Sequence, residues 1–115
     1  MTAARQQLGA RGEEQAARWY RRHGYVVVAR NWRSRHGELD LICRQGSLIV
    51  VAEVKTRRSD AYGHPAEAVT PAKQQRIRRL AAAWLAEQPP EAGREVRFDV
   101  VAILGGRIEV REGVF

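Results

Sequence analysis

Residues 38–55 constrain the fold more strongly than any other part of the chain. Two strand-like segments, 38–43 and 48–55, are separated by a four-residue turn at 44–47 that contains Gly46. Two apolar runs joined by a short glycine-containing turn are typical of a β-hairpin in which the glycine adopts a positive φ. The pattern therefore predicts an antiparallel hairpin within a β-sheet.

Ionisable side chains alternate with apolar ones over residues 38–41 and 52–55. If residue 44 faces residue 47 across the turn, Asp40 lies opposite Val51 and Glu38 lies opposite Glu53. The opposite face, which includes Leu39, is wholly apolar. Because side chains alternate between the two faces of a strand, one face then carries all the ionisable groups: Glu38, Asp40, Glu53 and Lys55.

In this register Asp40 and Glu53 are diagonal neighbours, roughly 7–8 Å apart at the backbone. Neighbouring carboxylates repel each other, so the pair requires a cation, which Lys55 or a divalent metal ion would supply. Carboxylate oxygens suit Mg²⁺ or Mn²⁺, with water and substrate phosphate completing the coordination. The spacing alone also fits a salt-bridged patch on an exposed sheet face. Glu38 fits a neighbour that tunes the local field better than it fits a ligand.

Helical periodicity occurs on both sides of this hairpin. Apolar residues recur at helical spacing over 11–23, and Gly24 is a natural stop. Thr70 and Pro71 fit the N-cap and first position of a second helix, whose apolar face includes Ile77 and which ends before Pro89. Further strands are expected at 25–32, 95–104 and 107–112, and a loop at 56–69. The order α-β-β-β-α-β-β predicts one α/β domain over 1–115, a small mixed β-sheet flanked by helices.

The charge of the chain is informative about its partners. Twenty Lys and Arg residues against thirteen Asp and Glu residues give a net charge of +7. This excess predicts a polyanionic partner such as nucleic acid. Residues 1–35 contain eight basic and two acidic side chains, whereas residues 36–70 contain four and five. Nucleic-acid binding explains the basic flank but not the carboxylates that gather in the middle of the chain.

The remaining composition excludes several classes of protein. A single cysteine, Cys43, excludes an internal disulfide framework and a cysteine-cluster zinc site. No apolar run approaches the ~18 residues of a membrane helix, and the N-terminus lacks the apolar core of a signal peptide. We therefore expect a cytoplasmic protein without membrane association, and no pattern indicates a small-molecule cofactor.

Helix geometry adds a fourth carboxylate to the three on the predicted hairpin. At about 100° per residue, Glu13 shares its face with Ala16 and Tyr20, the side expected to point inward. Glu14 shares its face with arginines and is expected at the surface. Glu13 is therefore a candidate site residue, although the helix dipole alone also favours a carboxylate near a helix start.

The acidic residues belong to a longer pattern. Gly-Glu-Leu-Asp at 37–40 followed by Glu-Val-Lys at 53–55 resembles the PD-(D/E)XK nuclease superfamily. More narrowly, the chain resembles the YraN family of small bacterial proteins, which are related to archaeal Holliday junction resolvases. The match runs nearly end to end and includes further positions: Gly12, Glu13, Asn31, Arg57, Lys73 and residues 98–101.

The resemblance implies a restriction-endonuclease-like fold and metal-assisted hydrolysis of phosphodiester bonds in DNA, including branched, Holliday-junction-like DNA. It implies that Asp40, Glu53 and the backbone carbonyl of Val54 hold Mg²⁺ or Mn²⁺. Glu13 would add a ligand directly or through water. Lys55 would orient the attacking water or stabilise the developing charge.

Four basic residues are candidates for nucleic-acid binding: Arg57, Arg58, Lys73 and Arg76. The two arginines follow the acidic motif directly, whereas the second pair fits a phosphate-contacting edge and a solvated helix face equally. Junction-specific cleavage would require a homodimer, because a two-fold symmetric substrate is matched by a two-fold symmetric protein. The final strand is an edge at which two copies could pair. The alternative function is a nucleic-acid-binding module of the same fold with little or no catalytic activity.

Overall fold

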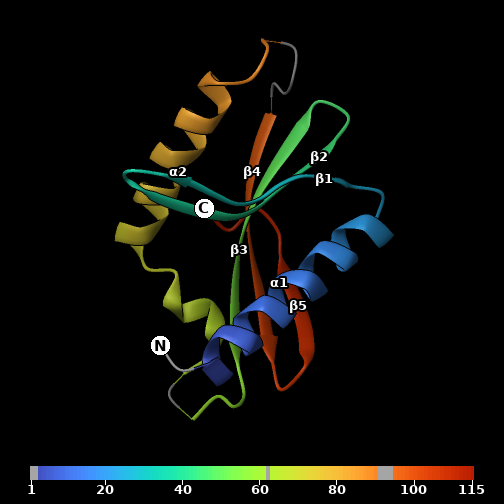
Figure 1. Cartoon of the computed structure of the whole chain (residues 1–115), viewed down its shortest axis with the longest axis vertical. Coiled ribbons are helices and arrows are strands. Elements are labelled where there is room, and N and C mark those ends of the chain that lie inside the picture. The colour runs from blue at the N-terminus through green and yellow to red at the C-terminus, as the bar shows by residue number, and fades with distance from the viewer. Residues whose placement is uncertain (1–2, 62, 91–94) are drawn as a thin grey trace.

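The computed structural model describes residues 3–61, 63–90 and 95–115. The predicted order of helix, three strands, helix and two strands is confirmed, in a mixed α/β architecture (Figure 1). A short 3₁₀ helix, η1, precedes the second helix. The elements are α1 (Ala3–Arg22), β1 (Val26–Ser34), β2 (Gly37–Gln45), β3 (Leu48–Arg57), η1 (Pro65–Ala68), α2 (Pro71–Ala86), β4 (Glu95–Leu104) and β5 (Arg107–Arg111).

The strands form one five-stranded sheet in the order β1-β2-β3-β4-β5. Neighbours are antiparallel except β3 and β4, which are parallel. Between these two strands the chain passes through η1 and α2, because parallel neighbours need a long crossover connection. β5 lies at one edge of the sheet, as the sequence predicts, and β1 lies at the other.

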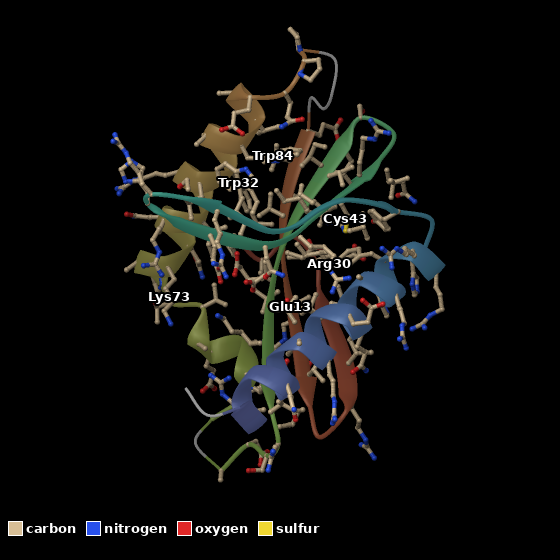
Figure 2. The ribbon with its side chains drawn as sticks, viewed as in Figure 1. Glu13, Arg30, Trp32, Cys43, Lys73 and Trp84 are labelled. Atoms are coloured by element: carbon tan, nitrogen blue, oxygen red, sulfur yellow. The ribbon has the colours of Figure 1, made fainter. Side chains whose placement is uncertain are left out.

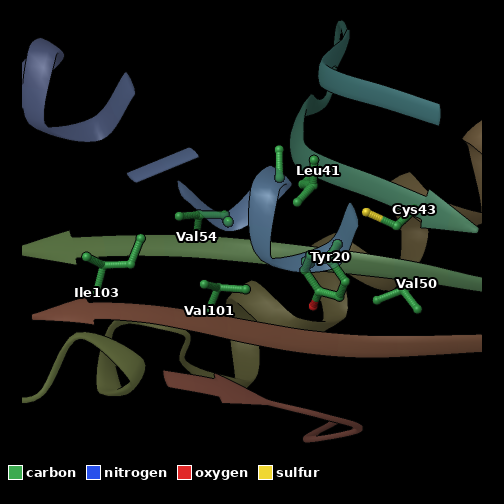
Figure 3. Packing of buried hydrophobic residues seen from close by; sticks show 10 residues of the cluster. Tyr20, Leu41, Cys43, Val50, Val54, Val101 and Ile103 are labelled. Carbon is green, nitrogen blue, oxygen red and sulfur yellow. The ribbon is translucent and has the colours of Figure 1, made fainter. Parts of the chain in front are cut away.

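The two helices cover opposite faces of the sheet. α1 buries Ala17 and Tyr20 against one face, where the apolar side chains of β2, β3 and β4 surround them (Figure 3). α2 buries Ile77, Leu80 and Trp84 against the other face. Each large side chain buried in this way stabilises the fold by roughly 1.5–3 kcal/mol. Neither helix has a described segment long and apolar enough to cross a membrane.

α1 begins earlier than the predicted 11–23 and includes glycines that the pattern treats as unfavourable. Gly12 has a packing reason, because a Cβ at this position would collide with the Thr56 side chain of β3 and lie 3.4 Å from Ile103 Cδ1. The glycine therefore allows α1 to approach the sheet closely. Gly24, with a φ of 86°, follows the helix as predicted.

The predicted loop at 56–69 is only partly correct. β3 continues through Arg57, which pairs with Leu104 of β4, and η1 occupies the later part of the segment. The start of α2 is as predicted. The Thr70 side chain accepts a hydrogen bond from the Lys73 N–H at 3.4 Å, and Pro71 is the first helical residue.

A buried ionic network joins α1 to the C-terminal end of the chain. Asp99 of β4 is fully buried. Its Oδ2 accepts hydrogen bonds from the Tyr20 hydroxyl at 2.7 Å and from Arg97 Nη2 at 2.9 Å. Its Oδ1 accepts from Arg97 Nε at 2.9 Å and from the Gly113 N–H at 3.0 Å, and Arg97 Nη2 also donates to the Tyr25 hydroxyl at 3.1 Å. These four bonds to the carboxylate offset the cost of burying its charge.

Candidate metal centre

Strands β2 and β3 separate partway along their length. Their last backbone pair is Leu41 with Ala52. β3 nevertheless stays paired with β4 to its end, and β2 stays paired with β1 to its first residue. The far end of the β1–β2 hairpin therefore diverges from β3 towards α2 (Figure 1). We refer to the gap between the two strands, at Asp40 and Glu53, as the fork.

The observed register corrects the predicted one. Gln45 pairs with Leu48, so the two residues of the turn are 46–47 and lie one position later than predicted, and Gly46 has a φ of 61°. The cross-strand partners predicted for the acidic residues are therefore wrong by two positions. A shift of two preserves the face of each side chain. Continuing the observed register sets Asp40 level with Glu53 instead of diagonal to it.

The predicted face of Leu39 is also wrong. Leu39 packs in the cluster beneath α2, whereas Leu41 and Cys43 pack beneath α1. Residues two apart in a regular strand point to the same face, so the alternation of β2 is broken at Asp40. Asn31, which lies across from Asp40 in β1, has a φ of 52°. Both strands of the hairpin are thus irregular at the same level.

Asp40 fills the fork with its carboxylate. It is half-buried, and its Oδ2 accepts a hydrogen bond from the Val54 N–H at 2.8 Å. The side chain takes the place of the backbone partner that β3 loses where the strands separate. The N–H and C=O of a strand residue point to the same side. The carbonyl of Val54 therefore faces the fork beside Asp40.

Glu53 is buried, with 5% of its surface exposed. Its Oε1 is the one fully buried side-chain nitrogen or oxygen that has no hydrogen-bond partner among residues 3–61, 63–90 and 95–115. Burial raises the pKa of Glu53 well above its ordinary value, the adjacent Asp40 carboxylate raises it further, and the Lys55 charge opposes both. A buried carboxyl group with an unpartnered oxygen is energetically costly. A bound cation would remove that cost.

On the α2 side, the fork opens into a cleft of about 120 Å³. Because Ile77 is buried beneath α2, Lys73 one turn earlier projects from the same side of the helix. Figure 2 shows Lys73 near the start of α2, below the end of the β1–β2 hairpin in this view. The lining residues come from the sheet and from α2 with its preceding turn: Glu38, Glu53, Lys55, Val69, Lys73, Arg76 and Ile77.

The hairpin touches α2 beside this cleft. A Cβ on Gly37, whose φ is 140°, would lie 3.2 Å from Leu80 Cδ1 and 4.0 Å from Arg76 Cδ. The end of the hairpin therefore packs against the helix that carries the basic residues. Glycine allows that close approach.

Three other residues singled out by the sequence are exposed: Glu38, Arg57 and Arg58. Glu38 pairs with Arg33 Nε at 3.1 Å, and both side chains are exposed. Arg57 Nη1 donates to the Thr56 carbonyl at 2.9 Å, and Arg58 is exposed in the bend after β3. Neither of these two arginines lines the cleft.

Glu13 contacts β1 from the α1 face, at the level of the fork. It is half-buried, and its Oε2 accepts a hydrogen bond from Asn31 Nδ2 at 3.1 Å. Glu13 does not line the cleft. Within the described parts of the chain, no three His, Cys, Asp or Glu side chains gather closely enough to hold a metal ion by themselves. Glu13 therefore does not complete a three-carboxylate cluster with Asp40 and Glu53.

The groups at the fork fit a hard divalent cation. Two adjacent carboxyl groups, one of them with an unpartnered oxygen, face the same gap as the Val54 carbonyl. Such oxygen donors suit Mg²⁺ and Mn²⁺. Mg²⁺ usually keeps several waters and takes one or two carboxylates plus substrate phosphate. Asp40, Glu53 and the Val54 carbonyl would be the protein donors for such an ion, with water and substrate completing its coordination.

Two features of the site were not predicted. The hydrogen bond from Val54 to Asp40 depends on the separation of β2 and β3, which no local residue pattern encodes. The left-handed conformation of Asn31 was indicated only weakly by the sequence. Asparagine is among the non-glycine residues that adopt it most readily, and Asn31 comes three residues after three consecutive valines at 26–28.

Fold and site together define a small mixed α/β protein with a carboxylate-lined cleft beside a basic helix. The family described as uncharacterised protein family UPF0102 matches residues 12–103. The chain belongs to this family, which confirms the predicted membership of the YraN type. The matched span includes every candidate site residue from Glu13 to Arg76.

Individual relatives agree over most of their length. A UPF0102 protein of Beutenbergia cavernae is 53% identical over 116 residues, which cover 96% of this chain and 98% of the relative. A UPF0102 protein of Nocardia farcinica is 58% identical over 100 residues, 87% of this chain and 78% of the relative. A third, from Rhodococcus opacus, is 57% identical over 99 residues, with 86% and 83% covered.

Proposed function

We propose that the chain is a metal-dependent endonuclease that hydrolyses phosphodiester bonds in DNA, with branched, Holliday-junction-like DNA as its candidate substrate. The observation that carries the proposal is the buried Glu53, whose Oε1 has no partner, beside Asp40 at the fork. In a chain of net charge +7, these carboxylates would repel a phosphate group unless a cation lay between them. A metal ion explains both the buried acid pair and the basic surroundings.

Each residue at the fork has a role in this proposal. Asp40, Glu53 and the Val54 carbonyl would hold Mg²⁺ or Mn²⁺, which polarises the phosphate and lowers the pKa of a bound water. Lys55, which lines the same cleft as Glu53, would orient the attacking water or stabilise the negative charge that develops on the phosphate. Glu13 would act through water.

Basic residues around the cleft would bind the DNA backbone. Lys73 and Arg76 line the cleft, and Arg57 and Arg58 would contact phosphates beyond the end of β3. Each neutralised phosphate releases counterions, so the affinity for DNA should fall steeply as salt concentration rises. Action on a four-way junction would also require a homodimer, which analytical ultracentrifugation would detect.

A second candidate function is nucleic-acid binding without hydrolysis. The observation that favours it is the small number of protein side chains available to bind a metal ion. Across the described residues, no cluster of three His, Cys, Asp or Glu side chains could hold a metal without help from substrate or backbone. A binding module would retain the salt-dependent affinity for DNA but would not depend on a divalent ion.

Calorimetric titration of Mg²⁺ and Mn²⁺ distinguishes these functions. The samples are the wild type, Asp40→Asn and the control Glu109→Gln, which alters an exposed carboxylate on β5. Cleavage of four-way and linear DNA is assayed on the same samples. We expect metal binding and metal-dependent cleavage in the wild type and the control, and neither in Asp40→Asn.

Two other results would contradict the nuclease proposal. No metal binding by the wild type, even with DNA present, would exclude the proposed metal centre. DNA binding without cleavage, unaffected by the Asp40→Asn substitution, would instead support the binding module.

A further inference from the structure

Asn31 is the only non-glycine residue with a positive φ in the described part of the chain, at 52°. It lies within β1, between the paired residues Arg30 and Trp32, so neither a turn nor a strand end explains its conformation. A left-handed residue inside a strand persists only where its surroundings hold it, and such outliers cluster at functional sites. The side-chain contacts of Asn31 show what this conformation achieves.

The left-handed conformation turns Asn31 towards α1. Arg30, the residue before it, also contacts α1, where its Nη1 donates to Glu14 Oε2 at 2.7 Å. Successive residues of a regular strand point to opposite faces, so a regular Asn31 would point away from α1. Instead, Asn31 Nδ2 donates to Glu13 Oε2 at 3.1 Å. The backbone irregularity therefore creates the contact with Glu13.

Asn31 also lies at the level of the fork. The flanking pairs Arg30 with Leu41 and Trp32 with Leu39 set it across from Asp40. Asp40 in turn accepts the hydrogen bond from the Val54 N–H. Asn31 thus connects α1 to the one point in the sheet where β2 and β3 separate. Figure 2 shows Glu13 and Arg30 at this junction of α1 with the sheet.

We propose that Asn31 is a positioning residue that fixes the Glu13 carboxylate at the fork, where Glu13 binds a water of the metal's hydration shell. This inference rests on the proposed function. An outer role for Glu13 agrees with the finding that, among the described residues, no three His, Cys, Asp or Glu side chains gather closely enough to hold a metal ion. Among the described residues only Oε2 of Glu13 takes part in a hydrogen bond, which leaves Oε1 to bind the water.

The test is Mn²⁺ affinity measured by calorimetry in the absence of DNA. Asn31→Gly removes the amide but retains a residue that adopts the left-handed conformation without cost. Loss of a group that orients a metal ligand typically weakens metal affinity 10–100-fold, and we expect about tenfold for Asn31→Gly. Urea unfolding of the same samples shows whether each variant is folded.

Arg30→Gln is the matched control. It removes a neighbouring contact from β1 to α1 of the same kind, but that contact involves Glu14 and not Glu13. We expect its Mn²⁺ affinity to stay within twofold of the wild type. If Arg30→Gln lost as much affinity as Asn31→Gly, Asn31 would matter only for attaching α1 to β1, and the inference would be overturned.

A double-mutant cycle with Glu13→Gln tests whether Asn31 influences Mn²⁺ affinity through Glu13. If Asn31 acts through Glu13, the Asn31→Gly substitution should change the affinity of the Glu13→Gln protein less than twofold. An equal loss in both backgrounds would overturn the inference. A wild type that binds Mn²⁺ while Asn31→Gly binds it equally well would overturn this inference alone. A wild type that binds no Mn²⁺ would overturn the proposed function as well.

Discussion

The substitution Tyr20→Phe should destabilise the protein by about 2 kcal/mol. The Tyr20 hydroxyl is fully buried and donates to Asp99 at 2.7 Å, and a hydrogen bond to a charged group contributes about 1.5–3 kcal/mol. Phenylalanine preserves the ring packing beneath α1. Asp99 retains both bonds from Arg97, so its charge stays paired. The loss should therefore stay below the 3–5 kcal/mol typical of breaking a buried ion pair.

Tyr25→Phe is the matched control. Its hydroxyl accepts from Arg97 Nη2 at 3.1 Å, but Tyr25 is only half-buried, so water can replace the lost group. We expect a cost below about 1 kcal/mol. Urea unfolding at pH 7.5, followed by tryptophan fluorescence, measures both variants. For a chain of this length, 2 kcal/mol corresponds to a fall in Tm of about 8 °C.

The effect of Tyr20→Phe should also depend on pH. Burial raises the pKa of Tyr20 far above that of an exposed phenol, and the Asp99 charge raises it further. Above about pH 10 the unfolded chain releases the phenolic proton while the folded protein keeps it. The wild type therefore loses up to about 1.4 kcal/mol of stability per pH unit above pH 10. Tyr20→Phe has no phenol at this position to titrate, so the two proteins should become equally stable near pH 11.5.

Two results would refute this reasoning. One is an equal loss of stability in Tyr20→Phe and Tyr25→Phe at pH 7.5. The other is a constant difference between the wild type and Tyr20→Phe from pH 8 to pH 11, since that would mean that the hydroxyl does not retain its proton on folding.

Three further predictions follow from buried groups. In EDTA at pH 7.5, Glu53→Gln should exceed the wild type in unfolding free energy by at least about 1 kcal/mol, because burial opposes the charge of the Glu53 carboxylate. Urea unfolding should show this advantage shrink towards pH 4.5, where the carboxyl group of the unfolded wild type also becomes protonated. In millimolar Mg²⁺ the order of stability should reverse, because only the wild type keeps the carboxylate that binds the ion. Gly12→Ala should cost about 1–3 kcal/mol through its collision with Thr56, and thermal denaturation should show most of it recovered in a Thr56→Ala background. Burial raises the pKa of Cys43 to about 12, so a thiol reagent at pH 8 should react only as fast as the protein unfolds, and rapid labelling would contradict the buried position.

The local sequence was sufficient to predict an element's boundary wherever a single residue type determines the backbone conformation at that position. Thr70 and Pro71 specify the start of α2, because a hydroxyl acceptor and a fixed φ serve the first turn of a helix and few other structures. Gly24 specifies the end of α1 in the same way. The positions of Glu53 and Lys55 on one face of β3 follow from strand alternation alone.

Sequence was insufficient where neighbouring strands decide the outcome. A two-residue loop around Gly46 can be formed by residues 45–46 or by residues 46–47, and each choice gives different cross-strand partners, so the register could not be fixed locally. The reversed face of Leu39 results from the irregularities at Asn31 and Asp40 in paired strands. Neither residue signals this alone. The hydrogen bond from Val54 to Asp40 exists only because the sheet separates there.

The fork restrains the β1–β2 hairpin unequally along its length. Over residues 41–45 the hairpin is paired with β3 and belongs to the continuous sheet. At its other end, before Asp40, it is held against α2 by Trp32, Leu39 and the contact at Gly37. Amide hydrogens at that end should exchange with solvent through small local openings, while those of β3 and β4 exchange only on larger unfolding. Displacement of this end of the hairpin from β3 would therefore disturb its packing against α2, the helix that carries the basic residues Lys73 and Arg76.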